Sequence, residues 1–165
     1  MERTTIRLRG ARSEDATAIA ALNNEYAAEG LMLARTPVTV AQAAHDYVVA
    51  VDAHGRLLAC GALKEYSPSL GEVAAIAVSR AAQGLGLGRE IVRAVEELAA
   101  KRGITEVFAL TLQPGFFEAL EYVQVDRARY PEKMRRDCIG CARRFACNEI
   151  CFMRDVSKLA VREAA

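Results

Sequence analysis

A glycine-rich loop is the feature that most limits what this chain can fold into. Glycines at 84, 86 and 88 follow an apolar run at 72–78 and precede a segment, 89–101, whose apolar residues recur at helical spacing. Glycines let a backbone approach a ligand closely, and the first N–H groups of a helix, with its dipole, attract anions. The order of strand, loop and helix therefore predicts that residues 83–89 bind a phosphate or pyrophosphate group.

Two common phosphate-binding loops do not match this segment. A Walker loop requires Gly-Lys followed by Ser or Thr, whereas Gly88 is followed by Arg89. The dinucleotide-binding fingerprint follows the first strand of a parallel βαβ unit, whereas here three antiparallel-looking strands precede the strand that leads into the loop. A glycine-rich turn without a ligand remains the alternative interpretation.

The whole chain, at 165 residues, predicts one mixed α/β domain with a short appendage. Apolar runs predict strands at 5–9, 47–51, 57–63, 72–78, 107–112 and 122–125. Capping residues and helical periodicity predict helices at 13–28, 39–46, 89–101 and 114–120, with Ser13 and Thr39 opening the first two. We expect the domain to cover 1–126 and a basic, cysteine-rich C-terminal segment, 127–165, to pack on it.

Charge and hydropathy argue against several classes of protein. The formal net charge is +1, without the large positive excess on which non-specific nucleic-acid binding relies. No apolar run approaches the roughly 18 residues of a membrane span, and residues 1–5 are charged and polar, unlike a secretory signal. We therefore expect a cytoplasmic protein with no membrane partner.

Four cysteines of the C-terminal segment predict a metal site. They are spaced x2, x5 and x3 apart, and clustered cysteines in a cytosolic protein bind metal more often than they form disulfides. Four thiolates suit zinc, and this spacing also suits an iron–sulfur cluster; reduced or disulfide-linked cysteines are the other alternative. A basic zinc knuckle could contact RNA, but few aromatic residues interleave with its charges. The predicted ligands are Cys138, Cys141, Cys147 and Cys151.

The loop and the strand before it resemble the acetyl-CoA motif of the GCN5-related N-acetyltransferases. The match consists of Ile76-Ala77-Val78 followed by Gln83-x-x-Gly86-x-Gly88, and the resemblance covers 4–126. It implies six or seven strands that splay apart between the fourth and fifth, with acetyl-CoA in the cleft. The strand residues would pair with the pantetheine arm. The pyrophosphate would lie on Gln83, Gly84, Leu85, Gly86, Leu87, Gly88 and Arg89, where Leu85 departs from the basic residue often found.

Further stretches resemble bacterial N-acetylglutamate synthases of the short, stand-alone type. They are 30–36, 60–63, 72–78, 110–117 and 131–141. This resemblance implies acetyl transfer from acetyl-CoA to the α-amine of L-glutamate, the first step of arginine biosynthesis, by direct attack in a ternary complex. The alternatives are an acetyltransferase for another small amine and a non-catalytic sensor of acetyl-CoA or metal. A homodimer is common in the superfamily.

The chemistry requires a base, an oxyanion donor and a proton for the departing thiolate. Glu72 is the candidate base, directly or through water, and its alternative role is a solvated carboxylate at a strand end. The family resemblance places the oxyanion donor at a main-chain amide near Ile76. Thr111 and Tyr122 are the candidates for protonating the thiolate. Tyr122 stands where the family has Gly-Phe, which leaves the end of the preceding helix open.

A dicarboxylate acceptor requires cations. Arg35 matches the substrate arginine of the resemblance and can bind a carboxylate in bidentate fashion. Lys64 and Leu33 are expected beside it, and Arg136, Arg143 and Arg144 are candidates for a second arginine. Cys60 lies alone in an apolar strand and is expected to be a buried, inert thiol. A metal-bound C-terminal segment would fold over this acceptor site.

Overall fold

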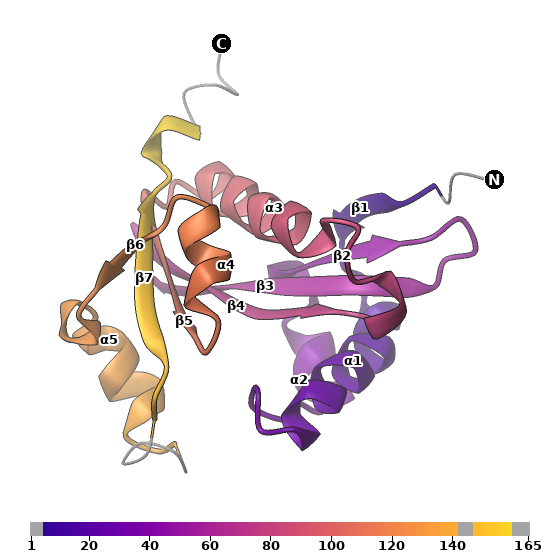
Figure 1. Cartoon of the computed structure of the whole chain (residues 1–165), viewed down its shortest axis with the longest axis horizontal. Coiled ribbons are helices and arrows are strands. Elements are labelled where there is room, and N and C mark those ends of the chain that lie inside the picture. The colour runs from indigo at the N-terminus through magenta and orange to yellow at the C-terminus, as the bar shows by residue number, and fades with distance from the viewer. Residues whose placement is uncertain (1–4, 142–146, 160–165) are drawn as a thin grey trace. The chain divides into compact units, whose positions relative to one another are not determined.

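A computed structural model describes residues 5–141 and 147–159 and has a mixed seven-stranded sheet with helices (Figure 1). The strand order is β1-β2-β3-β4-β5-β7-β6, which confirms the α/β class. The chain forms two compact units. The first comprises the chain up to Lys64 together with Val73–Leu98, and the second comprises Glu65–Glu72 and the chain from Ala99 onward. No helix among the described residues is long and apolar enough to cross a membrane.

The first unit contains β1 (Arg7–Gly10), β2 (Tyr47–Val51) and most of β3 (Leu57–Ser67) and β4 (Leu70–Val78). β1 pairs antiparallel with β2, and β2 with β3. The turn between β2 and β3 is closed by the Asp52 carboxylate, which accepts hydrogen bonds from the His54 and Arg56 amides, each at 2.9 Å. The strands predicted at 47–51 and 57–63 therefore form a hairpin.

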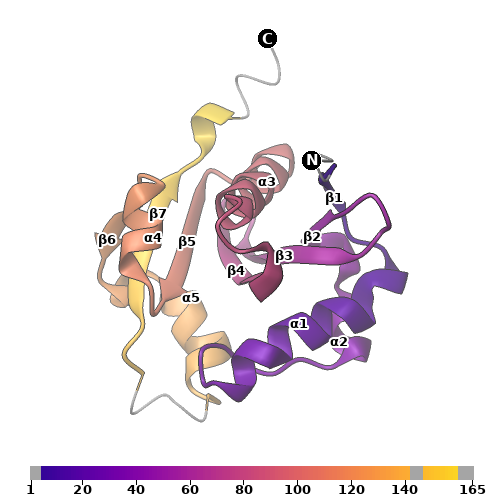
Figure 2. The same ribbon diagram turned by 45° about the vertical axis from the view of Figure 1, so that its right-hand side comes forward.

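Helices cover both faces of these strands (Figures 1 and 2). α1 (Ala16–Ala28) and α2 (Pro37–Gln42) lie on one face, and α3 (Leu87–Lys101) lies on the other. Residues of β3 alternate between them: Cys60 packs in the core on the α1 face. Gly61 faces α3, where an added Cβ would lie 2.5 Å from Ile91 Cγ2. A side chain at Gly61 would push α3 off the strand.

The predicted starts of α1 and α2 are wrong by about one turn. The chain at Ser13 begins a 3-10 turn, Ser13–Asp15, in which the Asp15 carboxylate accepts from the Arg12 amide at 2.7 Å and pairs with Arg9. α2 is capped by Thr36, whose hydroxyl accepts from the Thr39 amide at 3.2 Å, and Pro37 fills its first position. Proline suits the first turn because its missing N–H has no partner there, which explains the earlier start.

The second unit contains β5 (Glu106–Thr111), β6 (Val123–Val125), β7 (Ile150–Asp155), α4 (Pro114–Ala119), α5 (Pro131–Lys133) and a π-turn (Met134–Cys138). β7 lies between β5 and β6 and pairs antiparallel with both. The sequence did not predict β7, because its residues belong to the segment set apart as cysteine-rich. The C-terminal segment thus supplies a strand of the sheet itself.

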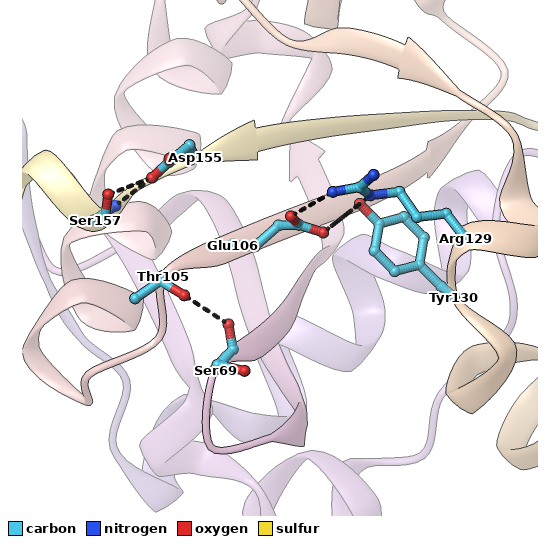
Figure 3. A network of polar contacts seen from close by, with 7 residues as sticks. All are labelled: Ser69, Thr105, Glu106, Arg129, Tyr130, Asp155 and Ser157. Atoms are coloured by element: carbon cyan, nitrogen blue, oxygen red, sulfur yellow. Dashed lines mark hydrogen bonds and ion pairs between the residues drawn. The ribbon is translucent and has the colours of Figure 1, made fainter.

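A polar network fixes the chain between β6 and α5 to β5 (Figure 3). The Glu106 carboxylate accepts from the Arg129 guanidinium at 2.9 Å and from the Tyr130 hydroxyl at 2.9 Å. The Tyr130 ring stacks on Phe108, with ring centroids 4.1 Å apart. These contacts place the start of α5, which carries Lys133, next to the β5 residue that pairs with Glu72.

The end of α4 contains a backbone conformation that usually requires glycine. Glu121 has φ 68°, and the amides of Glu121 and Tyr122 bond back to the carbonyls of Glu118 and Phe117. This is the helix-ending arrangement in which glycine is preferred because it has no Cβ. Gly30 and Gly103 adopt the same positive φ after α1 and α3. The departure from the family glycine therefore leaves the turn intact, with a glutamate in its place.

Candidate active site

The glycine loop in the first unit has the conformation expected of an anion-binding loop. Gly84 and Gly86 have φ values of 82° and 77°, and no atom lies within 4 Å of a Cβ built on either. Leu85 between them is 62% exposed, while Leu87, the first residue of α3, is buried. The loop thus leads into a 15-residue helix, and the first N–H groups of that helix are available to a phosphate.

The strand that leads into this loop is locally irregular. Ala75 of β4 has φ 56°, which side-chain-bearing residues rarely adopt in a strand. Ile76 and Val78 beyond it are half-buried, and Ala77 between them is 3% exposed and packs in the α1 face core. A left-handed residue departs from regular strand geometry directly before Ile76.

Arg35 lies in the connection between α1 and α2. Its backbone is held by Asn24, and its guanidinium donates to the Leu33 carbonyl at 3.3 Å. Among the described residues no carboxylate pairs with this half-buried guanidinium. A cation in such a position can take a carboxylate from a ligand. Leu33 is 56% exposed beside it, and Lys64, at the edge of the same unit, is half-buried.

Cys60 is the buried thiol that its position in an apolar strand predicted. It is 0% exposed, and burial raises its pKa to about 12. At neutral pH it is therefore a protonated thiol, which is neither nucleophilic nor ready to bind metal.

Glu72 in the second unit is buried and ion-paired, which corrects the alternative of a solvated strand-end carboxylate. The residue is 4% exposed, and Lys133 Nζ lies 2.9 Å from its Oε1. The Tyr66 hydroxyl is 3.4 Å from the same oxygen. Lys133 also lies 3.2 Å from Asp137 Oδ2, and Tyr66 donates a short hydrogen bond to Asp137. Four side chains from β3, β4, α5 and the π-turn thus form one network, in which Glu72 is buried and the other three are partly buried.

Opposing influences act on the charge of Lys133. Burial lowers its pKa, but the charges and hydrogen bonds of Glu72 and Asp137 outweigh burial and leave the pKa above its usual 10.5. Lys133 is therefore a cation at neutral pH. A fixed positive charge at 2.9 Å favours the ionised form of Glu72.

Sequence reasoning found Glu72 but missed its partners. Tyr66, Lys133 and Asp137 were given no role, although the Pro131-Glu132-Lys133 and Asp137-Cys138 stretches entered the family resemblance. The available signal was local: Lys133 and Asp137 are four residues apart, the spacing of an ion pair along a helix. Nothing local pairs either with Glu72, which is 61 residues from Lys133.

The two candidate proton donors lie in different surroundings. The Thr111 hydroxyl accepts from the Gln113 amide at 2.9 Å and so closes the turn into α4. Tyr122 is 4% exposed, and its ring packs edge-to-face on Phe117 at 5.0 Å. Of the second-arginine candidates, Arg136 donates to the Glu65 carbonyl at 2.7 Å and covers the Tyr66 ring. Arg143 and Arg144 lie outside the described residues.

The predicted metal site is not supported. Within residues 5–141 and 147–159 no group of three or more His, Cys, Asp or Glu side chains is placed to hold a metal ion. All four predicted ligands are in those ranges as free cysteines. Cys151 explains part of the failure: it is a β7 core residue packed with Phe108 and Tyr130, and burial raises its pKa to about 11. Neither zinc nor an iron–sulfur cluster fits this arrangement.

Comparison with protein families decides the assignment. Residues 14–124, more than half of the chain, match the model of the acetyltransferase (GNAT) family. The chain belongs to this family. It is therefore an acetyltransferase, and the donor that the family uses is acetyl-CoA. The glycine loop and the β4 residues before it lie within the matched range.

Relatives of this acetyltransferase include enzymes that act on amino acids. An uncharacterized N-acetyltransferase of Chlorobaculum tepidum is 36% identical over 89% of this chain and 94% of its own length. An amino-acid acetyltransferase of Mycobacterium tuberculosis is 32% identical over 72% of this chain and 69% of its own. The structure of N-acetylglutamate synthase from Neisseria gonorrhoeae, complexed with coenzyme A and N-acetyl-glutamate, superposes with a TM-score of 0.80 at 27% identity. That superposition covers 94% of this chain but 36% of the gonococcal one.

Proposed function

We propose that this acetyltransferase transfers the acetyl group of acetyl-CoA to the α-amine of L-glutamate, the first step of arginine biosynthesis. The observation that carries the proposal is Arg35. Its guanidinium is half-buried, has no carboxylate partner among the described residues, and lies in a stretch similar to the substrate-arginine segment of N-acetylglutamate synthases. Similarity to proteins named amino-acid acetyltransferase and N-acetylglutamate synthase supports the same acceptor.

On the donor side, residues 83–89 would hold the pyrophosphate of acetyl-CoA, and Ile76, Ala77 and Val78 would pair with its pantetheine arm. The positive φ of Gly84 and Gly86 and the free first turn of α3 support the first assignment. The irregular Ala75 supports the second, because the strand departs from regular geometry directly before these three residues. The amide near Ile76 would then donate to the thioester oxygen as it becomes an oxyanion.

The proposed reaction is a direct attack in a ternary complex. The deprotonated amine nitrogen forms a bond to the thioester carbon, and the carbon–sulfur bond then breaks to release the CoA thiolate. The α-ammonium first loses a proton to Glu72, directly or through a water molecule, which frees the nitrogen lone pair for this attack. The nitrogen loses its second proton to solvent as the carbon–sulfur bond breaks. The thiolate takes a proton from Thr111 or Tyr122, and that hydroxyl regains a proton from solvent. Lys133 favours ionised Glu72, which keeps the carboxylate ready to accept a proton but weakens it as a base.

Turnover of acetyl-CoA with a panel of free amino acids tests the acceptor, with acetylated products read by mass spectrometry. The panel pairs L-glutamate with L-glutamine, L-aspartate and glutamate γ-methyl ester, which change one feature of the acceptor at a time. We expect L-glutamate to be the best substrate, since Arg35 lacks a carboxylate partner. If an amino acid without the second carboxylate is the better substrate, the protein is still an acetyltransferase, but glutamate is not its preferred acceptor.

Two variants separate catalysis from a sensor role. We expect Glu72→Gln, which removes the proton acceptor but keeps the shape, to lower kcat by roughly 100-fold or more. Cys138→Ser should leave kcat within about twofold, because the cysteines are not assembled as a metal site. A non-catalytic sensor predicts the opposite order, with function intact in the first variant and lost in the second.

A further inference from the structure

Helix α1 carries three polar side chains that point into the first unit rather than to solvent. Asn23 is 0% exposed, and Asn24 and Tyr26 are half-buried. Burying amide and hydroxyl groups costs free energy unless they are hydrogen-bonded, so their partners show what they do. All three bond to the main chain of segments that the proposed reaction uses.

Asn24 holds the backbone of Arg35 from both sides. Its Nδ2 donates to the Arg35 carbonyl at 2.8 Å, and its Oδ1 accepts from the Arg35 amide at 2.8 Å. Arg35 lies in a connection outside any helix or strand, so no regular pairing would otherwise fix its Cα. The two bonds set the position from which the guanidinium extends.

Tyr26 holds the entry to the glycine loop in a similar way. Its hydroxyl donates to the Val78 carbonyl at 2.5 Å and accepts from Gln83 Nε2 at 2.9 Å. Val78 ends β4, and Gln83 begins the motif, so one hydroxyl joins the proposed pantetheine segment to the proposed pyrophosphate loop. Arg80 lies over the Tyr26 ring at 4.9 Å and pairs with Glu29. The last turns of α1 thus hold the whole segment 78–83.

Asn23 adds a third contact, to the irregular residue of β4. Its Nδ2 lies 3.4 Å from the Ala75 carbonyl and 3.6 Å from Cys60 Sγ. The Cys60 thiol also points to that carbonyl, at 3.7 Å. The left-handed conformation of Ala75 is therefore supported from α1 and from β3.

We propose that α1 is the element that positions both substrates, with Asn24 acting on the acceptor through Arg35 and Tyr26 acting on the donor through Val78 and Gln83. The acceptor half rests on the proposed function, whereas the donor half requires only acetyl-CoA. Asn24 and Tyr26 are positioning residues, because each acts on a substrate through another residue that it holds in place. Loss of either contact should weaken the binding of one substrate and leave the other unchanged.

The test compares Asn24→Ala and Tyr26→Phe in the full chain. We expect Asn24→Ala to raise the KM for the acceptor by about tenfold, since two hydrogen bonds are lost, with acetyl-CoA binding unchanged. Tyr26→Phe should raise the Kd for acetyl-CoA, measured by calorimetry, by about fivefold and leave the acceptor KM unchanged. Glu25→Ala is the matched control, because Glu25 is exposed on the same turn and has no hydrogen bond or ion pair among the described residues.

A second variant at position 24 separates positioning from folding. Asn24→Gln keeps both the amide donor and the amide acceptor, so the acceptor KM should rise less than it does in Asn24→Ala. If Asn24→Ala and Tyr26→Phe instead change both substrates equally, or only lower the melting temperature, α1 has no positioning role. The acceptor arm uses the best amine from the panel, whichever it is. If glutamate is not the acceptor, this test can still be made with the amine that is. An acceptor KM that Asn24→Ala leaves unchanged would overturn the inference about α1 without affecting the proposed function.

Discussion

Arg35 and Lys133 are both partly buried cations, but their surroundings differ. Lys133 lies 2.9 Å from Glu72 and 3.2 Å from Asp137, so two protein carboxylates neutralise it. Arg35 has no carboxylate partner among the described residues and donates to a main-chain carbonyl instead. Removing a cation that the protein has already paired leaves its carboxylates uncompensated, and a cation without a carboxylate partner can bind an anionic ligand. The difference predicts which substitution affects stability and which affects substrate binding.

The largest expected effect is on stability at Lys133. We expect Lys133→Met to lower the free energy of unfolding by about 3 kcal/mol, because Glu72 and Asp137 would then lie together without a cation. Urea unfolding followed by circular dichroism measures it. The triple variant that also carries Glu72→Gln and Asp137→Asn should recover most of the lost free energy of unfolding. If Lys133→Met alone does not fold, the stability of the triple variant is the measurement. A loss below about 1 kcal/mol would make the pair equivalent to a surface ion pair.

Arg35→Ala should affect the use of substrate strongly and the stability of the fold little, the opposite of Lys133→Met. We expect kcat/KM for glutamate to fall by roughly 10- to 100-fold, the equivalent of one or two charge-assisted hydrogen bonds. The free energy of unfolding should change by less than about 1 kcal/mol, and acetyl-CoA binding should not change. Arg35→Lys keeps the charge but not the bidentate geometry, so it should restore activity only in part. A destabilised Arg35→Ala with normal kinetics would remove the contrast with Lys133.

A carboxylate placed beside Arg35 should neutralise its guanidinium, as Glu72 and Asp137 neutralise Lys133. Leu33 is 56% exposed, and its own carbonyl accepts from the Arg35 guanidinium. We expect Leu33→Asp to raise the glutamate KM about fivefold, because an internal carboxylate would compete with the substrate. Leu33→Asn has nearly the same shape without the charge and should leave the KM near its original value. Equal effects of the two substitutions would show that charge is not the cause.

The smallest expected effect is on how the free energy of unfolding changes with pH in the alkaline range. The pKa of Lys133 in the fold lies above 10.5, so its ion pairs stabilise fully below the pKa of an unfolded lysine. This contribution is lost as the pH rises through the folded pKa. Tyr66 adds to the same effect, because burial raises its pKa as well. Unfolding free energies above about pH 10 should therefore fall more steeply for the native chain than for Lys133→Met. Parallel slopes would contradict the raised pKa.

The glycine loop was predictable because its signals are local. Gly84 and Gly86 have the positive φ that their spacing before a helix suggested, and α3 begins at Leu87, within two residues of the expected start. The turn at 52–56 and the end of α1 at Ala28, shortly before Gly30, follow from equally local chemistry. The start of α2 was misplaced because two threonines, Thr36 and Thr39, both suit an N-cap, and Pro37 decides between them.

The cysteine segment shows why a spacing pattern alone can mislead. The pattern x2, x5, x3 suits a metal, but Cys151 is a buried β7 residue that belongs to the same core cluster as Phe108. Strand geometry, which the sequence did not suggest here, decides the direction of that side chain. A cysteine placed in an apolar core stabilises by burial and is not available as a thiolate.

The sequence by itself determined the glycine loop, the end of the strand before it and the start of α3, because neighbouring residues set each of them. It also singled out Glu72 and Arg35 by resemblance. Only the tertiary structure decided that Glu72 is paired with Lys133 and Asp137, and that Asn24 and Tyr26 reach Arg35 and Val78. These contacts join residues that are far apart in the chain or lie on different elements. Their distances depend on how strands and helices pack, which no local pattern specifies.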